Sequence, residues 1–341
     1  MNDRRGAPVA ATERAAGLAV PEKTAAGPAP GPARTRGQGR AAALAPVALV
    51  IAGGLSVQFG ASVAVLLMPR AGALGVVTLR LGAAALVMLL VCRPGLRGYS
   101  RADWGTVLAF GTVMCGMNTL FYQAADRIPL GAAVTLEVLG PLALSVIVSR
   151  RLISVVWAGL ALGGVVLLSG MAAPLLDPGR EFGEGFDSLD PVGAAYALGA
   201  GVMWAAYIVF SARTGRRFPQ ADGLALAMTV AAVLTLPLGI LESGSKLLVP
   251  STLGLGALVA VLSSVLPYTL ELMALRRLPA PTFAILMSLE PAIAATAGFL
   301  VLGQALTATD ALAIALVIGA SMGAVRSQTR PRGPERNHAL A

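Results

Sequence analysis

The chain has few of the residues on which most enzyme chemistry depends. Among its 341 residues are one histidine, His338, and two cysteines, Cys92 and Cys115, which lie in apolar segments. A histidine-assisted nucleophile or a metal site is therefore not expected. The segment GASMG at 319–323 matches a hydrolase nucleophile motif, but it lies inside an apolar stretch, where its glycines favour helix packing. We expect no metal, no cofactor and no enzymatic activity.

Charged residues are also scarce, and their placement excludes further classes of protein. They make up 13% of the chain, about half the usual share of a soluble domain. Lys23 and Lys246 are the only lysines and no phosphate-binding loop motif occurs, so the chain is not expected to be an ATP-driven pump. Basic residues in the tails and in the short loops between apolar stretches give the net charge of +9, a pattern that the positive-inside rule of membrane proteins explains without nucleic acid.

Long apolar stretches dominate the rest of the chain, in which 56% of the residues are hydrophobic. Each is close to the ~20 residues that a helix needs to cross a bilayer, where only a helix pairs all of its own backbone groups. The sequence therefore predicts an all-α integral membrane protein with ten transmembrane helices. The predicted spans are 43–66, 72–92, 103–123, 129–149, 152–171, 191–212, 222–241, 252–274, 279–302 and 306–325.

The segments outside the spans predict the orientation. Residues 1–42 and 326–341 are expected to be basic cytoplasmic tails, the first of them disordered, and 172–190 an acidic external loop. With the N-terminus in the cytoplasm, cytoplasmic segments hold 21 Lys and Arg residues and external segments hold 4. This asymmetry predicts a multi-pass protein of the inner (plasma) membrane with both termini cytoplasmic.

An internal repeat relates the two halves of the chain. At an offset of 150, RIPLGAAVTLEVLGP at 127–141 aligns with RLPAPTFAILMSLEP at 277–291, which matches an arginine, a leucine and two prolines. Five helices per half is an odd number, so residues 43–171 and 191–325 are expected to be inverted relative to each other. Such inverted repeats are typical of secondary transporters, whose site lies near the midplane.

Four charged residues fall inside predicted spans, where charge is costly and marks function by default. They are Arg80, Glu137, Glu271 and Glu290. In the functional interpretation, Arg80 binds a substrate carboxylate and a glutamate binds a proton or an ammonium group. In the structural interpretation, a buried Arg–Glu pair holds helices together, and Glu271 pairs with Arg276 or Arg277 near the cytoplasmic surface.

Polar and aromatic residues at other mid-span positions are weaker candidates for the same site. They can line a cavity, but hydrogen bonds between helices or an interfacial belt explain them equally well. The set is Gln58, Asn118, Tyr122, Gln123, Trp204, Tyr207 and Tyr268.

Four segments resemble the EamA family of the drug/metabolite transporter superfamily, and most closely its threonine/homoserine exporter branch. They are VTLRLGAAAL (77–86), ADRIPLGAAVTLEVLGPL (125–142), SSVLPYTLELMALRRLP (263–279) and FAILMSLEPAIAATAGFLVLGQ (283–304). The resemblance spans about residues 43–325 and excludes both tails. One departure is Gln304, which stands where many members of the family carry glutamate.

The resemblance implies two five-helix EamA repeats and proton-driven export of a small amino-acid-like substrate such as threonine or homoserine. It places substrate or coupling roles on Arg80, Glu137, Tyr268, Glu271 and Glu290. A broad drug/metabolite permease or an importer of the same fold remains the alternative. A non-transporting membrane enzyme or sensor lacks the motifs that it would need, and no oligomeric state is predicted.

Overall fold

The computed structural model describes residues 36–149, 152–168, 189–219, 221–275, 277–278 and 280–329. Within these ranges the regular structure is helical and contains no β-strand. Residues 42–341 form one unit, and the contacts described below lie inside it. Most of the expected N-terminal tail, external loop and C-terminal tail lies outside the described residues.

The helices follow the predicted spans closely in most of the chain. The first half holds α1 (Arg36–Cys92), α2 (Arg101–Ala125), α3 (Leu130–Ser149) and α4 (Leu152–Leu168). The second half holds α6 (Pro191–Thr214), α7 (Asp222–Ser243), η2 (Gly244–Leu248), α8 (Pro250–Ala260), η3 (Val261–Val265), α9 (Leu266–Leu275), α10 (Ala280–Met287), α11 (Glu290–Leu302) and α12 (Ala308–Thr329).

Among the described residues, eight helical segments are long and apolar enough to cross a membrane. One of them, Ala45–Cys92, has 48 residues, and a shorter apolar helix covers Val155–Leu167. Because a span needs about 20 residues, the 48-residue segment is long enough for two crossings. The chain is therefore a multi-pass α-helical membrane protein.

A turn at Gly72 divides α1. Gly72 has φ 64° and ψ 165°, which a glycine adopts without a Cβ clash. The Glu242 carboxylate accepts hydrogen bonds from the amides of Leu74 (2.7 Å) and Gly75 (3.1 Å), at the start of the second part of the helix. The Ser243 hydroxyl donates to the carbonyl of Ala71, the last residue before the turn. The end of α7 thus satisfies backbone groups that the turn leaves without helical partners.

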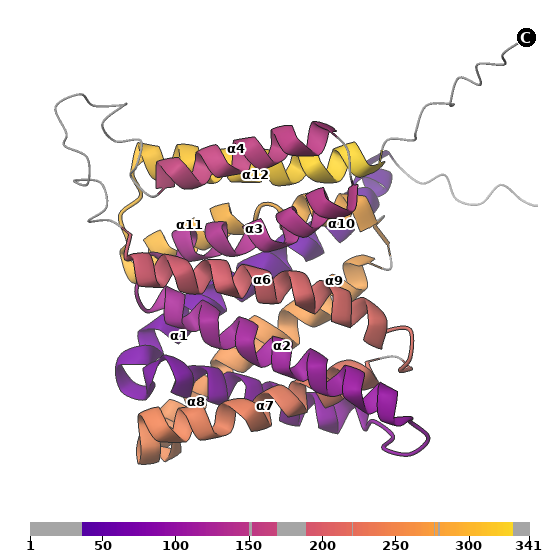
Figure 1. Cartoon of the computed structure of the whole chain (residues 1–341), viewed down its shortest axis with the longest axis vertical. Helices are drawn as coiled ribbons and strands as arrows, with labels where there is room; N and C mark the ends of the chain where they lie inside the picture. Colours follow the sequence, from indigo (N-terminus) through magenta and orange to yellow (C-terminus); the bar gives the residue numbers. More distant parts are fainter. Residues whose placement is uncertain are drawn as a thin grey trace, which may run out of the picture. The chain divides into compact units, whose positions relative to one another are not determined.

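The helices lie side by side in Figure 1, with α4 and α12 at one edge and α7 and α8 at the other. Helix α2 packs against α6 and α7, α3 packs against α6 and α11, and α4 packs against α12. Helices from the first half of the chain are therefore neighbours of helices from the second half. Side chains from the two halves meet where these helices pack together.

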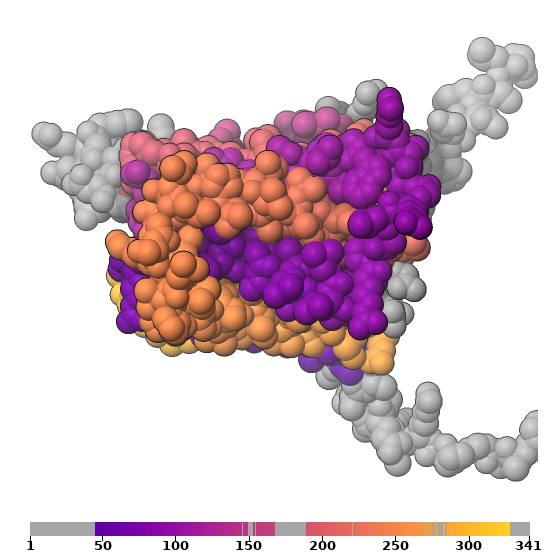
Figure 2. Space-filling model, turned by 90° about the horizontal axis from the view of Figure 1, so that it is seen from below, coloured from indigo at the N-terminus to yellow at the C-terminus, as the bar shows by residue number. Residues whose placement is uncertain are grey.

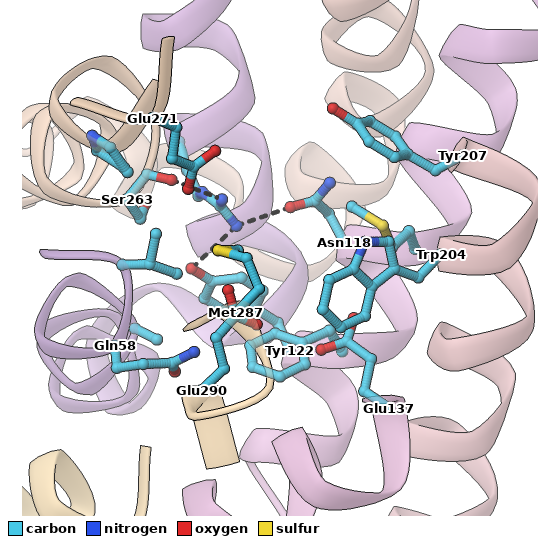
Figure 3. A pocket seen from close by; sticks show the side chains of 16 residues that line it. Gln58, Asn118, Tyr122, Glu137, Trp204, Tyr207, Ser263, Glu271, Met287 and Glu290 are labelled. Carbon is cyan, nitrogen blue, oxygen red and sulfur yellow. Dashed lines mark hydrogen bonds between the residues drawn. The ribbon is translucent and has the colours of Figure 1, made fainter. Parts of the chain in front are cut away.

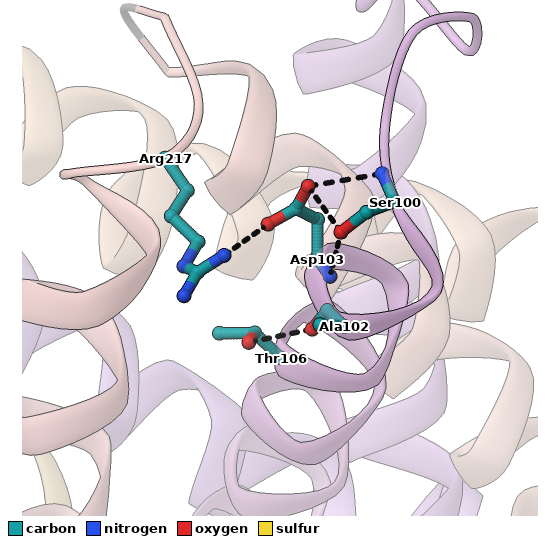
Figure 4. Close-up of polar contacts among 5 residues, drawn as sticks. All are labelled: Ser100, Ala102, Asp103, Thr106 and Arg217. Atoms are coloured by element: carbon teal, nitrogen blue, oxygen red, sulfur yellow. Dashed lines mark hydrogen bonds and ion pairs between the residues drawn. The ribbon is translucent and has the colours of Figure 1, made fainter.

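Polar contacts at both ends of α2 and α6 show that these two helices are antiparallel. Figure 4 shows Arg217, just after α6, in an ion pair of 2.7 Å with Asp103 at the start of α2, where Ser100 caps the helix. At the opposite ends, Arg127 forms an ion pair of 3.2 Å with Asp190, the N-cap of α6. The hydrogen bond from the Val192 amide, together with Arg127, holds the pKa of the Asp190 carboxyl below its usual value.

The outer surface carries many large apolar side chains, as expected for helices in contact with lipid. Figure 2 shows one face, on which the indigo and purple surface of α1 and α2 borders the orange surface of α7–α9. Helices on this face carry exposed side chains that include Leu86, Leu90, Val91, Leu236 and Leu241. Such side chains are costly in water but not in hydrocarbon.

The structure differs from the predicted spans at three places. Helix α1 begins at Arg36, so residues 36–42 are helical, and it continues through Pro69 to a break at Gly72 rather than ending near residue 66. The span predicted at 279–302 is broken between α10 and α11, because Pro291 lacks the amide hydrogen that a continuous helix needs. The span predicted at 252–274 contains a π-helical turn at Val261–Val265.

Candidate functional site

Nine of the eleven candidate side chains line one cavity of about 180 Å³ between the helices. They come from α1, α2, α3, α6, α9 and α11, so their proximity depends on the fold and not on the sequence spacing. The nine, most of which are labelled in Figure 3, are Gln58, Arg80, Asn118, Tyr122, Glu137, Trp204, Tyr207, Glu271 and Glu290. Of the other two, Gln123 is not among the lining residues, and the side chain of Tyr268 lies outside the described residues. Their functional roles remain predictions.

The Arg80 guanidinium is the cationic centre of the cavity. Its Nη1 donates to Asn118 Oδ1 at 2.7 Å and to the Tyr122 hydroxyl at 3.3 Å. Its Nη2 donates to the backbone carbonyl of Ser263 at 3.1 Å, and its Cζ lies 5.5 Å from the centre of the Tyr122 ring. The planar group is therefore fixed by partners on both halves of the chain.

The acceptor on Ser263 exists because the helix is irregular at this point. In a regular α-helix this carbonyl would bond the amide of residue 267, but Pro267 has no amide hydrogen. The π-helical turn at Val261–Val265 also shifts the local pairing, and the Leu262 carbonyl accepts a hydrogen bond of 2.5 Å from the Ser56 hydroxyl. Carbonyl groups released from helix pairing thus bind side chains of α1.

Three carboxyl groups share the cavity with Arg80. Glu137 and Glu290 are 9% and 7% exposed, and Glu271 is partly buried. Among the described residues, no ion pair joins Arg80 to Glu137, Glu271 or Glu290, so the predicted Arg–Glu pair does not form there. Glu271 lines the cavity rather than pairing with Arg277, and Arg276 lies outside the described residues. The cavity therefore combines one cation with carboxylates that are available to a ligand.

Glu137 is positioned by a close contact between the backbones of α3 and α6. A Cβ atom on Gly140 would lie 1.8 Å from the Gly201 carbonyl oxygen, and a Cβ on Gly201 would lie 2.5 Å from that of Glu137. Only glycine permits this approach. The contact holds the segment that carries Glu137 against the helix that carries Trp204.

Glu290 stands at the break between α10 and α11. It is the first residue of α11, and Pro291 follows it in the first turn, where a missing amide hydrogen is tolerated. The first turn of a helix has unpaired amide groups and a partial positive charge, which favours an acidic side chain there. The helix break thus places a carboxyl group and a helix N-terminus together beside the cavity.

Gln304 has a structural position outside this cavity. Its Oε1 accepts a hydrogen bond of 3.1 Å from the amide of Leu130, the first residue of α3. Gln304 therefore caps the helix that carries Glu137, and a neutral amide oxygen is sufficient for this contact.

Some groups that line the cavity were only weaker candidates in the sequence, and one was not predicted from it. Gln58 and Tyr207, two of the weaker candidates, line the cavity, whereas Gln123 is not among its lining residues. The carbonyl of Ser263 was missed, although Pro267 four residues later was a usable signal. Within the described ranges, no three His, Cys, Asp or Glu side chains gather in a way that could hold a metal ion.

Charged groups around a cavity inside a multi-pass helical bundle are typical of membrane transport proteins. Residues 191–326 match the model of the EamA-like transporter family. The chain is 40% identical over 278 residues to the threonine/homoserine exporter RhtA of Escherichia coli (strain K12) and to that of Salmonella typhimurium (strain LT2). These matches cover 82% of this chain and 90% of each relative.

A solved crystal structure has a similar fold, with a TM-score of 0.52 and 20% identity over 83% of this chain and 99% of that chain. The chain belongs to the EamA-like transporter family, in the branch of the threonine/homoserine exporter RhtA.

Proposed function

We propose that this protein is a proton-coupled exporter of small amino acids, such as threonine and homoserine, across the inner membrane. The observation that carries the proposal is the cavity itself, in which Arg80 faces the same space as Glu137, Glu271 and Glu290. The names of the similar relatives support the substrate class and the direction of transport.

The charges of the cavity match those of a zwitterion. Arginine has five N–H donors, and three hydrogen bonds join Arg80 to protein acceptors. Its Nε has no protein partner among the described residues, so the guanidinium keeps capacity for a substrate carboxylate. The ammonium group of the same substrate is bound by one of the three carboxylates.

The size of the cavity favours a small substrate over a drug-sized one. Its volume of about 180 Å³ is below the range of ~300–1,000 Å³ that is typical of sites for drug-sized ligands. The broad drug permease is therefore the weaker alternative.

Proton coupling requires that proton and substrate binding depend on each other. A carboxyl group binds either a proton or a substrate ammonium, so occupation by one displaces the other. Three carboxylates at a single cavity supply such a group. The proton gradient is the proposed driving force, and no cofactor is involved.

The proposed architecture is ten transmembrane helices in two inverted five-helix repeats, at residues 43–171 and 191–325. The count treats the two parts of α1 on either side of Gly72 as separate spans and includes the short helix α4. The contacts of Arg217 and Arg127 place the arginine-rich segments at 93–101 and 213–217 at the same end of α2 and α6. The proposal puts that end, and both termini, in the cytoplasm.

The proposal is tested by substrate export from cells that lack their own amino-acid exporters. Expression of the full chain should raise the concentration of threonine or homoserine that stops growth and should accelerate loss of the preloaded radiolabelled amino acid. The matched control is the Arg80→Gln chain at equal membrane abundance. Accelerated loss of a dye or drug without any effect on amino acids would instead support the permease.

A further inference from the structure

One polar side chain at the cavity has hydrogen-bonding capacity that the protein does not use. Gln58 lies on the first part of α1, lines the cavity and is 3% exposed. Its Oε1 is buried and has no hydrogen-bond partner among the described residues. Buried polar atoms are normally hydrogen-bonded, so an unpaired one at a cavity has its capacity free for a bound ligand or a water molecule.

The second amide of the cavity is already occupied. Asn118 Oδ1 accepts from Arg80 at 2.7 Å, and its Nδ2 donates to the Met114 carbonyl at 2.8 Å. In Figure 3, Gln58 lies on the same side of the cavity as Glu290, across from Trp204. Of the two amides, Gln58 is therefore the one with a polar atom that has no partner among the described residues.

The cavity offers a ligand both charged groups and a neutral amide, and these recognise different parts of an amino acid. Arg80 and the three glutamates match the carboxylate and ammonium groups that every amino acid carries. The Gln58 amide is neutral and has both donor and acceptor atoms, and a rotation by half a turn exchanges their positions. A hydroxyl group, which both donates and accepts, is its natural complement.

We infer that Gln58 is a specificity-determining residue that hydrogen-bonds the side-chain hydroxyl of the substrate. The inference rests on the proposed function, since it assigns the recognition of threonine and homoserine within the same cavity. A site that bonds a substrate hydroxyl rejects the analogue that lacks it, because the polar group of the site is then left unpaired.

A single analogue tests this assignment, because threonine and homoserine both become 2-aminobutyrate when the hydroxyl is replaced by hydrogen. Purified full-length chain in proteoliposomes is assayed for uptake of the three compounds, and the ratio of kcat/KM values is compared. Gln58→Met keeps the length of the side chain and removes both polar atoms. Gln123→Met makes the same change on α2, at a residue that is not among those lining the cavity.

The wild-type chain should prefer homoserine and threonine over 2-aminobutyrate by at least about tenfold. Gln58→Met should reduce that preference by about tenfold while 2-aminobutyrate is still transported, and Gln123→Met should leave it unchanged. An unchanged preference in Gln58→Met, or an equal loss for all three compounds, would overturn the inference. Gln58→Leu is measured beside it in case the methionine variant does not fold. Absence of all amino-acid transport by the wild-type chain would instead refute the proposed function.

Discussion

The Arg80 guanidinium donates a hydrogen bond of 3.1 Å to the backbone carbonyl of Ser263, 183 residues away in sequence. Pro267 leaves that carbonyl without its regular helical partner. A proline in the second half of the chain thus creates an acceptor for a cation in the first half. A charge that is costly in the membrane is thus held by a helix irregularity, which is itself tolerated only beside a cavity or a neighbouring helix.

Arg80→Lys is expected to reduce transport severely although the positive charge remains. An ammonium group is a point donor and cannot reach Asn118, Tyr122 and Ser263 with the planar geometry of guanidinium. We expect substrate affinity to fall by at least about tenfold, since hydrogen bonds to charged groups contribute ~1.5–3 kcal/mol each. The dissociation constant of purified protein measures the effect. Arg127→Lys, at an exposed end of the bundle, is the control, and an equal loss in both variants would argue against a special role of Arg80.

Pro267→Ala is expected to weaken the same interaction through the backbone. Alanine supplies the amide hydrogen that can pair with the Ser263 carbonyl, so the intrahelical bond competes with Arg80. Substrate affinity should fall by about tenfold while the variant unfolds at the same or a higher temperature. The control is Pro237→Ala, because Pro237 is an exposed residue inside α7. If the Pro267→Ala variant bound substrate with wild-type affinity, the interaction of Arg80 with the Ser263 carbonyl would not depend on Pro267.

Gly140→Ala is expected to destabilise the protein. The added Cβ would lie 1.8 Å from the Gly201 carbonyl oxygen, so α3 and α6 must separate. Overpacking of this kind costs ~1–3 kcal/mol, and thermal unfolding in detergent should occur at a clearly lower temperature. Gly159→Ala on α4 is the matched control, since no atom lies within 4 Å of its added Cβ. If the Gly140→Ala and Gly159→Ala variants unfolded at the same temperature, the contact between α3 and α6 would be less rigid than the structure indicates.

Substitution of the buried glutamates is expected to uncouple transport from the proton gradient. Glutamine keeps the shape of the side chain but cannot release a proton, so in the proposed cycle Glu290→Gln or Glu137→Gln abolishes the dependence of transport on an imposed pH gradient. Exchange of substrate across the membrane by counterflow needs no proton gradient. It should therefore persist, at a reduced rate, in a glutamine variant that has lost proton coupling but still binds substrate. Glu242→Gln, at the end of α7 and outside the cavity, is the control. If both cavity variants retained a wild-type response to the gradient, these two carboxylates would not carry the proton.

The helices themselves could be predicted because each follows from local composition. Apolar length and the prolines and charges that flank it locate α2, α6, α7 and α12 to within a few residues. The boundary of α1 could not be predicted in the same way. Its break lies at Gly72 rather than at Pro69, because the end of α7 supplies partners for the backbone there.

The sequence by itself determined that the chain is a helical membrane protein and which buried charges are candidates for a site, because residue type and depth in the span already make a charge costly in lipid. Only the tertiary structure decided that Arg80 is held by a backbone carbonyl rather than by a glutamate, and that Glu271 joins the cavity. It also decided that Gln58 Oε1 has no hydrogen-bond partner among the described residues, while both polar atoms of Asn118 have one. These points depend on which helices pack together and on where proline and the π-helical turn release backbone groups, and neither is fixed by local pattern.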